Sequence, residues 1–216
     1  LHNYLRISLT DQCNFRCTYC MPHEHMQFMP SSNLMQRPEI LQLAKIFVAH
    51  GVTKIRLTGG EPLVRKDFAG IWQDLTALGV ELTLTTNGML LDTYLPVLQA
   101  AGIRSINISL DSLRPERFQL MTQRNQFDRV WNNLLKTLQA GIKVKVNVVA
   151  KKGFIEDELN DFINITKALP LHVRFIEFMP FTGNGWKSEH VITAQQMLAE
   201  VTKENDIVKL NDGPHD

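Results

Sequence analysis

Short segments in which apolar and polar residues alternate recur along the chain, separated by longer segments with helical periodicity. The alternating segments are 5–10, 54–58, 81–85, 106–110, 143–149 and 172–177, with 207–210 as an additional short candidate. The helical segments are 38–50, 67–78, 92–101, 115–140 with a break near 123–126, 156–168 and 193–204. Strands that alternate with helices of this length predict parallel βα units.

The predicted strands carry polar side chains at every second position, although a parallel strand covered on both faces should be almost continuously apolar. Leu5 and Ile7 share one face of the first strand, whereas Arg6 and Ser8 share the other. The later polar positions are Lys54, Arg56, Thr58, Thr83, Thr85, Asn107, Ser109, Asp111, Lys143, Lys145, Asn147, His172 and Arg174. If the apolar faces meet the helices, the polar faces line the interior of a curved sheet. The sequence therefore predicts an α/β fold, an incomplete parallel (β/α)6 barrel of the TIM-like type.

The predicted barrel interior is wet and cationic, whereas Val, Ile and Leu fill the interior of an ordinary TIM barrel. Its charged side chains are Arg6, Lys54, Arg56, Lys143, Lys145 and Arg174, with only Asp111 opposing them. Buried charges need partners, so this interior predicts an anionic ligand such as a phosphate. Lys54 and Lys143 lie near strand starts, where an outward orientation is an alternative.

All three cysteines lie in one loop after the first predicted strand, at Cys13, Cys17 and Cys20. Three thiolates fill three iron sites of a four-iron cluster and leave one iron open to a substrate or cofactor. A structural zinc site with His23 or His25 as the fourth ligand is an alternative, and so are three unliganded thiols.

Chemically useful residues also follow the later strands. The segment 59–62 (GGEP) ends the second strand, where glycines let the backbone approach a ligand closely, and Glu61 can accept from a ligand ammonium group. A simple turn is the alternative for this segment. Thr85, Thr86 and Asn87 offer hydroxyl and amide groups at the next strand end, and Ser109 with Asp111 does so at the one after, where a plain cap is the alternative for each. The soft side chain of Met179 suits an adenine face.

Length, composition and charge indicate the number of domains, the expected partners and the cellular compartment. A chain of 216 residues that is 44% hydrophobic suits one domain, and a net charge of +1 gives no reason to expect nucleic acid or an anionic membrane as partner. No apolar run approaches the ~20 residues that span a bilayer, and no signal peptide opens the chain. With three neighbouring cysteines, these features favour a cytoplasmic protein in a reducing compartment.

The cysteine spacing Cys13-x₃-Cys17-x₂-Cys20, followed by GGEP after the second strand, resembles the radical S-adenosylmethionine enzymes. Within that superfamily, longer strings resemble the GTP 3′,8-cyclases of molybdenum cofactor biosynthesis. They are ISLTDQCNFRCTYCMP (7–22), KIRLTGGEPLVR (54–65), TTNG (85–88), NISLDSL (107–113), KVKVNVV (143–149) and RFIEFMP (174–180). The resemblance covers nearly the whole chain and implies a barrel of the radical S-adenosylmethionine type.

The resemblance also implies a set of site residues. Cys13, Cys17 and Cys20 would hold a [4Fe-4S] cluster whose open iron binds S-adenosylmethionine. The implied cofactor contacts are Tyr19, Gly60, Ser109 and Met179, with Glu61 nearby, and the implied GTP contacts are Arg6, Arg56, Thr85 and Lys145.

The activity implied is the conversion of GTP to (8S)-3′,8-cyclo-7,8-dihydroguanosine 5′-triphosphate, begun by a 5′-deoxyadenosyl radical that removes the ribose C3′ hydrogen. The implied partners are GTP, an electron donor and the downstream pterin synthase, and a homodimer is compatible with the family.

One departure from the family pattern limits what we expect of these residues. The family has a second three-cysteine cluster and a Gly-Gly tail in a C-terminal region, and neither occurs in this sequence. We therefore expect a single domain over 1–216, truncated at both ends, that binds a cluster but cyclises GTP poorly. The alternatives are a radical S-adenosylmethionine enzyme acting on a peptide or another substrate, and a non-catalytic zinc-binding or GTP-binding protein.

Overall fold

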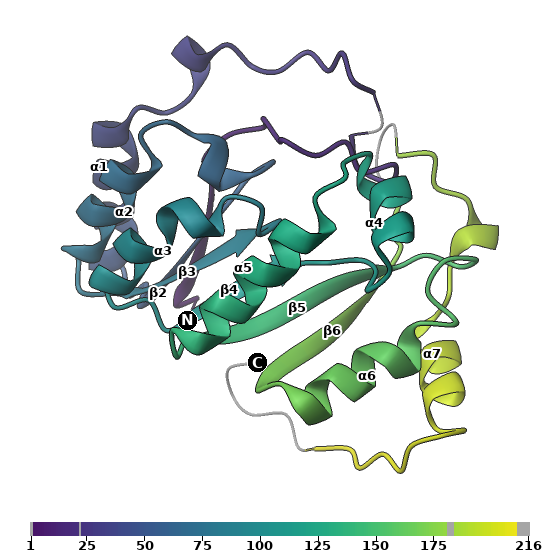
Figure 1. The fold of residues 1–216 in the computed structure, drawn as a ribbon. Coiled ribbons are helices and arrows are strands. Elements are labelled where there is room, and N and C mark those ends of the chain that lie inside the picture. Colours follow the sequence, from purple (N-terminus) through teal and green to yellow (C-terminus); the bar gives the residue numbers. More distant parts are fainter. Residues whose placement is uncertain (1, 22, 181–183, 211–216) are drawn as a thin grey trace.

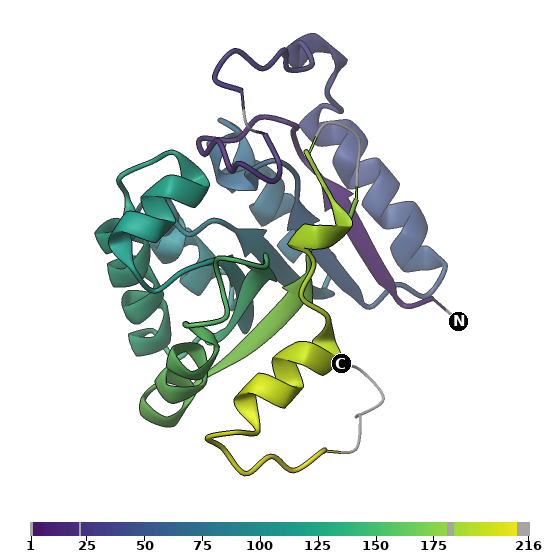
Figure 2. The ribbon, with the colours of Figure 1, turned by 90° about the vertical axis from the view of Figure 1, so that its right-hand side faces the viewer.

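Six parallel strands form one curved sheet in the computed structural model, which describes residues 2–21, 23–180 and 184–210 (Figure 1). The strands are β1 (Tyr4–Ser8), β2 (Lys54–Thr58), β3 (Glu81–Thr86), β4 (Ser105–Ser109), β5 (Lys143–Ala150) and β6 (Leu171–Glu177). Strands that are consecutive in the chain are neighbours in the sheet, so β1 and β6 form its two edges. The view in Figure 2 shows the sheet as an open arc. The predicted incomplete parallel barrel is confirmed.

Helices connect the strands and pack against the apolar side of the sheet. They are α1 (Arg37–Ala49), α2 (Phe68–Thr76), α3 (Leu91–Ala100), α4 (Pro115–Thr122), α5 (Phe127–Gln139), α6 (Leu159–Ala168) and, after β6, α7 (Ala194–Val201). Short 3₁₀ helices span Ser31–Asn33, Pro62–Val64 and Ser188–His190. Helix α5 packs on β5 and α6 on β6, and the apolar side chains of strands and helices form one continuous core.

The period-two pattern of the strands divides the sheet into an apolar and a polar face, as predicted. Ile55 and Leu57 of β2 are fully buried, whereas Arg56 between them is only half-buried. The register places polar positions side by side, because Arg6 of β1 is aligned with Arg56. The polar positions therefore run across neighbouring strands as one surface on the inner side of the arc.

Local sequence signals set the helix boundaries. The Gln36 backbone N–H donates to Glu39 Oε2 at 2.6 Å in a capping box, and Pro38 occupies the first turn, so α1 begins at Arg37, one residue before Pro38. The predicted break within 115–140 is also present. It lies between α4 and α5, where Gln123 adopts a left-handed conformation with φ 54°.

Two predicted elements differ from the structure. Residues 207–210 form no strand, and Val208 and Leu210 are each 79% exposed, because they pair with no neighbouring strand. The helix predicted from residue 156 begins only at Leu159. The reason is that the carboxylate of Glu158 is buried and accepts hydrogen bonds from Ser112 Oγ and the Leu113 backbone N–H, which fixes the chain just before the helix.

Within the residues that the structure describes, no helix combines the length and the apolar character that crossing a membrane requires.

The core of the sheet gives a prediction about stability. Leu84 of the central strand β3 is fully buried, so Leu84→Ala should lower the free energy of unfolding by about 3 kcal/mol through lost burial and the cavity left behind. Urea denaturation measures this. Leu120→Ala in α4, where the side chain is 68% exposed, should change it by less than about 0.5 kcal/mol. Equal losses in the two variants would contradict this assignment of the core.

Candidate functional site

The cysteine loop follows β1 and is fixed to the end of α4. The backbone N–H groups of Arg16 and Thr18 donate to the carbonyls of Thr122 and Met121, at 3.0 and 2.9 Å. Arg124 adds a hydrogen bond from Nε to the carbonyl of Asn14 at 3.1 Å. A segment without regular secondary structure is thereby held in place by a helix more than 100 residues later in the sequence.

The three cysteines lie close enough to influence one another electrostatically. Cys13 and Cys17 are half-buried and Cys20 is exposed. Burial raises the pKa of the Cys17 thiol well above its ordinary value, and the negative charges of Asp111 and the other two thiolates raise it further. The Cys13 sulfur accepts hydrogen bonds from the Phe15 backbone N–H at 3.4 Å and from Asn87 Nδ2 at 3.8 Å. The loop thus concentrates three sulfurs whose ionised forms repel one another.

The alternative zinc ligands do not join this set. His23 and His25 are exposed. Within the described ranges no three His, Cys, Asp or Glu side chains, the three cysteines included, are gathered as around a bound metal ion.

The glycines of the GGEP segment allow two backbone segments to touch. A Cβ atom on Gly59 would lie 2.4 Å from the Thr10 carbonyl oxygen, and one on Gly60 would lie 2.4 Å from the Gln12 carbonyl oxygen. The Gly60 and Glu61 N–H groups donate to these same carbonyls, at 2.7 and 2.8 Å. The sequence predicts that these glycines admit a ligand. In the structure they admit the segment that leads into the cysteine loop.

Glu61 is a buried carboxylate with hydrogen-bond donors around it. It accepts from Thr86 Oγ1 at 2.8 Å and from the backbone N–H groups of Leu63 and Asn87, at 3.1 and 2.6 Å. Burial raises its pKa to about 7, and the three donors limit that rise. Glu61 therefore connects the end of β2 to the end of β3, and its contact with a cofactor stays a prediction.

Asp111 does not oppose the cations of the barrel interior, which corrects the sequence-based expectation. Its carboxylate accepts from the Tyr19 hydroxyl at 2.5 Å and from the Val149 backbone N–H at 2.8 Å. Burial raises the pKa of Asp111 to about 6. The reason for the difference is position: Asp111 lies beyond the end of β4, next to the cysteine loop.

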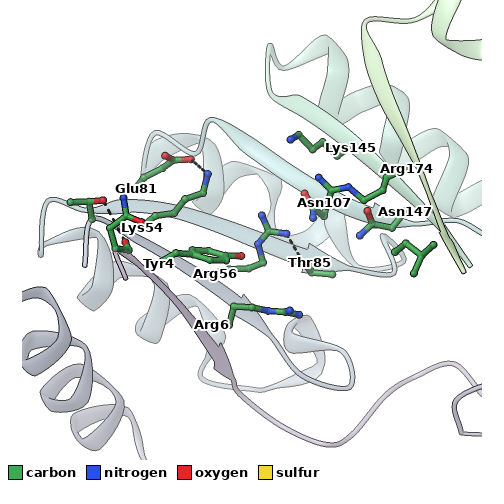
Figure 3. Close-up of a pocket in the computed structure, with 13 residues that line it drawn as sticks. Tyr4, Arg6, Lys54, Arg56, Glu81, Thr85, Asn107, Lys145, Asn147 and Arg174 are labelled. Atoms are coloured by element: carbon green, nitrogen blue, oxygen red, sulfur yellow. Dashed lines mark hydrogen bonds and ion pairs between the residues drawn. The ribbon is translucent and has the colours of Figure 1, made fainter. Parts of the chain in front are cut away.

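A cavity of about 690 Å³ lies against the polar face of the sheet (Figure 3). Its volume is in the range typical of small-molecule sites. Five of its lining side chains are cationic and one is a carboxylate. The lining residues are Asn3, Tyr4, Arg6, Thr53, Lys54, Arg56, Glu81, Thr85, Asn107, Lys145, Asn147, Arg174 and Ile176.

The four residues that the resemblance assigns to GTP all line this one cavity, namely Arg6, Arg56, Thr85 and Lys145. For Lys54 and Lys143 the sequence left an outward orientation open. In the structure Lys54 lines the cavity and pairs with Glu81 at 2.9 Å. Lys143 is exposed and lies outside the lining. Glu81 was missed as an interior residue, although its spacing from Thr83 and Thr85 places it on the same face.

Arg56 lies in the cavity beside two other arginines. Its Nη1 donates to Thr85 Oγ1 at 3.5 Å, and its guanidinium lies 5.6 Å from the centre of the Tyr4 ring. Its Nε is buried and has no hydrogen-bond partner in the described part of the chain. Burial lowers the pKa of Arg56, and the positive charges of Arg6 and Arg174 lower it further. An anion in this cavity would relieve both the missing hydrogen bond and the repulsion.

Two further predicted cofactor residues lie at strand ends. Ser109 is half-buried at the end of β4, and Met179 follows β6 with 62% of its surface exposed. Core packing does not explain the position of the Met179 side chain. Because it is exposed, it is free to cover a ligand.

Comparison with known proteins shows where this chain is similar to others. Residues 7–165 match the family model described as the Radical SAM superfamily. Molybdenum cofactor biosynthesis protein moc-5 of Caenorhabditis elegans is 47% identical over 219 residues, covering 100% of this chain and 36% of the relative. The mitochondrial GTP 3′,8-cyclase of Arabidopsis thaliana is 47% identical over 206 residues, covering 94% of this chain and 53% of the relative. The chain thus spans about a third to a half of the length of these relatives.

Solved structures show the same fold. Streptococcus suis SuiB bound to S-adenosylmethionine superimposes with a TM-score of 0.75 at 16% sequence identity, covering 93% of this chain and 47% of that chain. At this identity the likeness concerns the fold alone.

The contact at Gly60 gives a prediction about packing. Gly60→Ala should lower the free energy of unfolding by about 3 kcal/mol, because the new methyl group meets backbone atoms that cannot rotate away. Thermal or urea denaturation measures the loss. Gly102→Ala is the matched control: Gly102 has φ +72° and open space around it, so its cost should be only about 1 kcal/mol. A Gly60→Ala variant as stable as the parent would refute the close approach.

The buried carboxyl of Glu61 gives a prediction about pH. Its pKa of about 7 exceeds the ordinary 4.5, so the folded state retains the proton at pH values where the unfolded state loses it. The stability that this group contributes is therefore fully present below about pH 4.5 and is lost as the pH rises through 7. Glu61→Gln cannot ionise. Between pH 4.5 and 7.5 the difference in unfolding free energy between parent and variant should shift by up to about 3 kcal/mol in favour of the variant. Urea titrations at several pH values test this, and a constant difference would contradict it.

Proposed function

The chain belongs to the radical SAM superfamily, and from this premise we propose that it acts as a GTP 3′,8-cyclase in molybdenum cofactor biosynthesis. The observation that carries the proposal is the charge of the cavity. The guanidinium groups of Arg6, Arg56 and Arg174 line it together, and the carboxylate in its lining, Glu81, pairs with Lys54. A nucleoside triphosphate supplies negative charge for these guanidinium groups and an acceptor for the Nε of Arg56, which no described residue satisfies, whereas an uncharged peptide segment supplies no charge.

The cofactors of the superfamily are S-adenosylmethionine and an iron–sulfur cluster, and the cysteine loop carries the thiol donors that such a cluster takes. Binding would draw the three sulfurs together, because the described side chains are not gathered around a metal position. Three thiols lie on one loop, and two N–H groups already point at the sulfur of Cys13, as suits a cluster ligand. We assign Cys13, Cys17 and Cys20 to a [4Fe-4S] cluster. When bound, the cluster and S-adenosylmethionine supply the radical that removes the C3′ hydrogen of GTP. The protein's part is to position the reactants and exclude competing reactions.

The remaining site residues divide between the surroundings of the cysteine loop and the cavity on the inner face of the sheet. Around the cysteine loop, the proposed contacts to S-adenosylmethionine are Tyr19, Gly60, Ser109 and Met179. In the cavity, Arg6 and Arg56 suit bidentate contacts to phosphate oxygens, and Lys145 suits a point-charge contact. Thr85 accepts from Arg56 and so holds the guanidinium against the wall of the cavity. Arg174 lines the same cavity and adds to its positive charge.

GTP binding tests the proposal. Arg56→Ala and Lys145→Ala should each weaken GTP binding at least about tenfold, since each removes a charge-assisted contact to phosphate worth roughly 1.5 kcal/mol or more. Isothermal titration of the anaerobically reconstituted chain measures the affinity, and visible absorbance checks that the cluster is retained.

Lys143→Ala is the matched control, because Lys143 is two residues before Lys145 on β5 but lies outside the cavity lining. It should leave the affinity for GTP unchanged. Normal GTP affinity in both cavity variants, or no GTP binding by the parent chain, would overturn the assignment of the cavity to GTP.

A further inference from the structure

Asn87 links the buried Glu61 carboxylate to the sulfur of Cys13. Its backbone N–H donates to Glu61 Oε2 at 2.6 Å, and its side-chain Nδ2 lies 3.8 Å from Cys13 Sγ and 2.6 Å from Asn14 Oδ1. Neither Asn87 nor Asn14 is among the site residues that the sequence predicts. The sequence marks Asn87 as one of three polar residues at the end of β3, with Thr85 and Thr86, but assigns a ligand only to Thr85.

The hydrogen-bond network determines which way the Asn87 amide points. The Met89 backbone N–H can only donate, and it lies 3.0 Å from Asn87 Oδ1. The oxygen therefore faces Met89, and the NH₂ group faces Asn14 and the sulfur. Asn14 is oriented consistently, because its oxygen accepts from Asn87 and its own Nδ2 lies 3.0 Å from Met89 Sδ.

The turn that carries Asn87 is fixed from both sides. On one side, Glu61 is 1% exposed and accepts the Asn87 N–H. On the other, Asn133 of α5 is 2% exposed and donates from Nδ2 to the carbonyls of Gly88 and Met89, at 2.9 and 3.1 Å. Because the backbone of this turn is fixed, the side-chain amide of Asn87 is preorganised beside the Cys13 sulfur.

A hydrogen bond to a thiolate that ligates iron withdraws electron density from the cluster and favours the reduced state, which carries the additional negative charge. We propose that Asn87 is a positioning residue that orients Cys13 and, through the Nδ2–H···Sγ hydrogen bond, raises the reduction potential of the cluster. The inference rests on the cluster part of the proposed function and is independent of GTP.

A redox titration of the reconstituted full chain, followed by electron paramagnetic resonance, tests the proposal. Asn87→Ala removes the donor and should shift the midpoint potential to a more negative value. Asn87→Asp keeps the oxygen that accepts from Met89 but places a carboxylate oxygen where the NH₂ group was, so its shift should be larger and in the same direction. Iron and sulfide analysis accompanies each titration.

Asn132→Asp is the matched control, because it makes the same change at an exposed position of α5 and should leave the potential unchanged. An unshifted potential in iron-loaded Asn87→Ala and Asn87→Asp would overturn the inference while leaving the proposed function intact. Failure of both variants to retain iron would also overturn it, because Asn87 would then serve assembly rather than the potential. A parent chain that takes up no iron would defeat the proposed function and this inference together.

Discussion

The period-two alternation of a parallel strand is the constraint on which this structure depends. It forces the side chains of each strand to opposite faces, so that an apolar face such as Ile55 and Leu57 packs on helices while Arg56 turns inward. Because the strands are parallel and in chain order, the inward positions of all six lie on one concave surface. The same order brings the strand ends together at one rim, where the cysteine loop and the GGEP segment meet. The cavity and the rim that carries the cysteine loop therefore both follow from the alternation of side chains along parallel strands.

The cavity and the rim with the cysteine loop have opposite electrostatic character. In the cavity, positive charge exceeds negative charge, and Arg56 lies near Arg6 and Arg174 with a buried Nε that no described residue satisfies. At the rim, the pKa values of Glu61 and Asp111 are raised by burial, and the thiols of the cysteine loop raise one another's pKa. The rim therefore favours the binding of a cationic group, and the cavity favours the binding of an anionic group. This separation fits a metal cluster at one position and a triphosphate at the other.

Hydrogen bonds and close backbone contacts hold the loops at this rim in place. The glycines at 59 and 60 let one loop rest directly on another, and Glu61 joins the ends of β2 and β3. Asn133 fixes the turn after β3, and α4 holds the cysteine loop by backbone hydrogen bonds. These contacts join segments that are far apart in the chain and fix the position of the cysteine loop relative to the strand ends.

The sequence by itself determined the strands, most helix boundaries, the parallel order and the inward face of each strand, because all of these follow from local periodicity and turn residues. It also indicated Arg6, Arg56, Thr85 and Lys145, whose spacing in their strands is a local property. It placed Asp111 wrongly, overlooked Glu81, and marked Asn87 as a polar residue at a strand end without giving it a partner. Which carboxylate meets which partner depends on contacts between segments far apart in the chain, such as Tyr19 with Asp111 or Asn87 with Cys13. Those pairings, and the use of the paired glycines for contact between loops, were decided only by the tertiary structure, because local patterns contain no information on distances between distant segments.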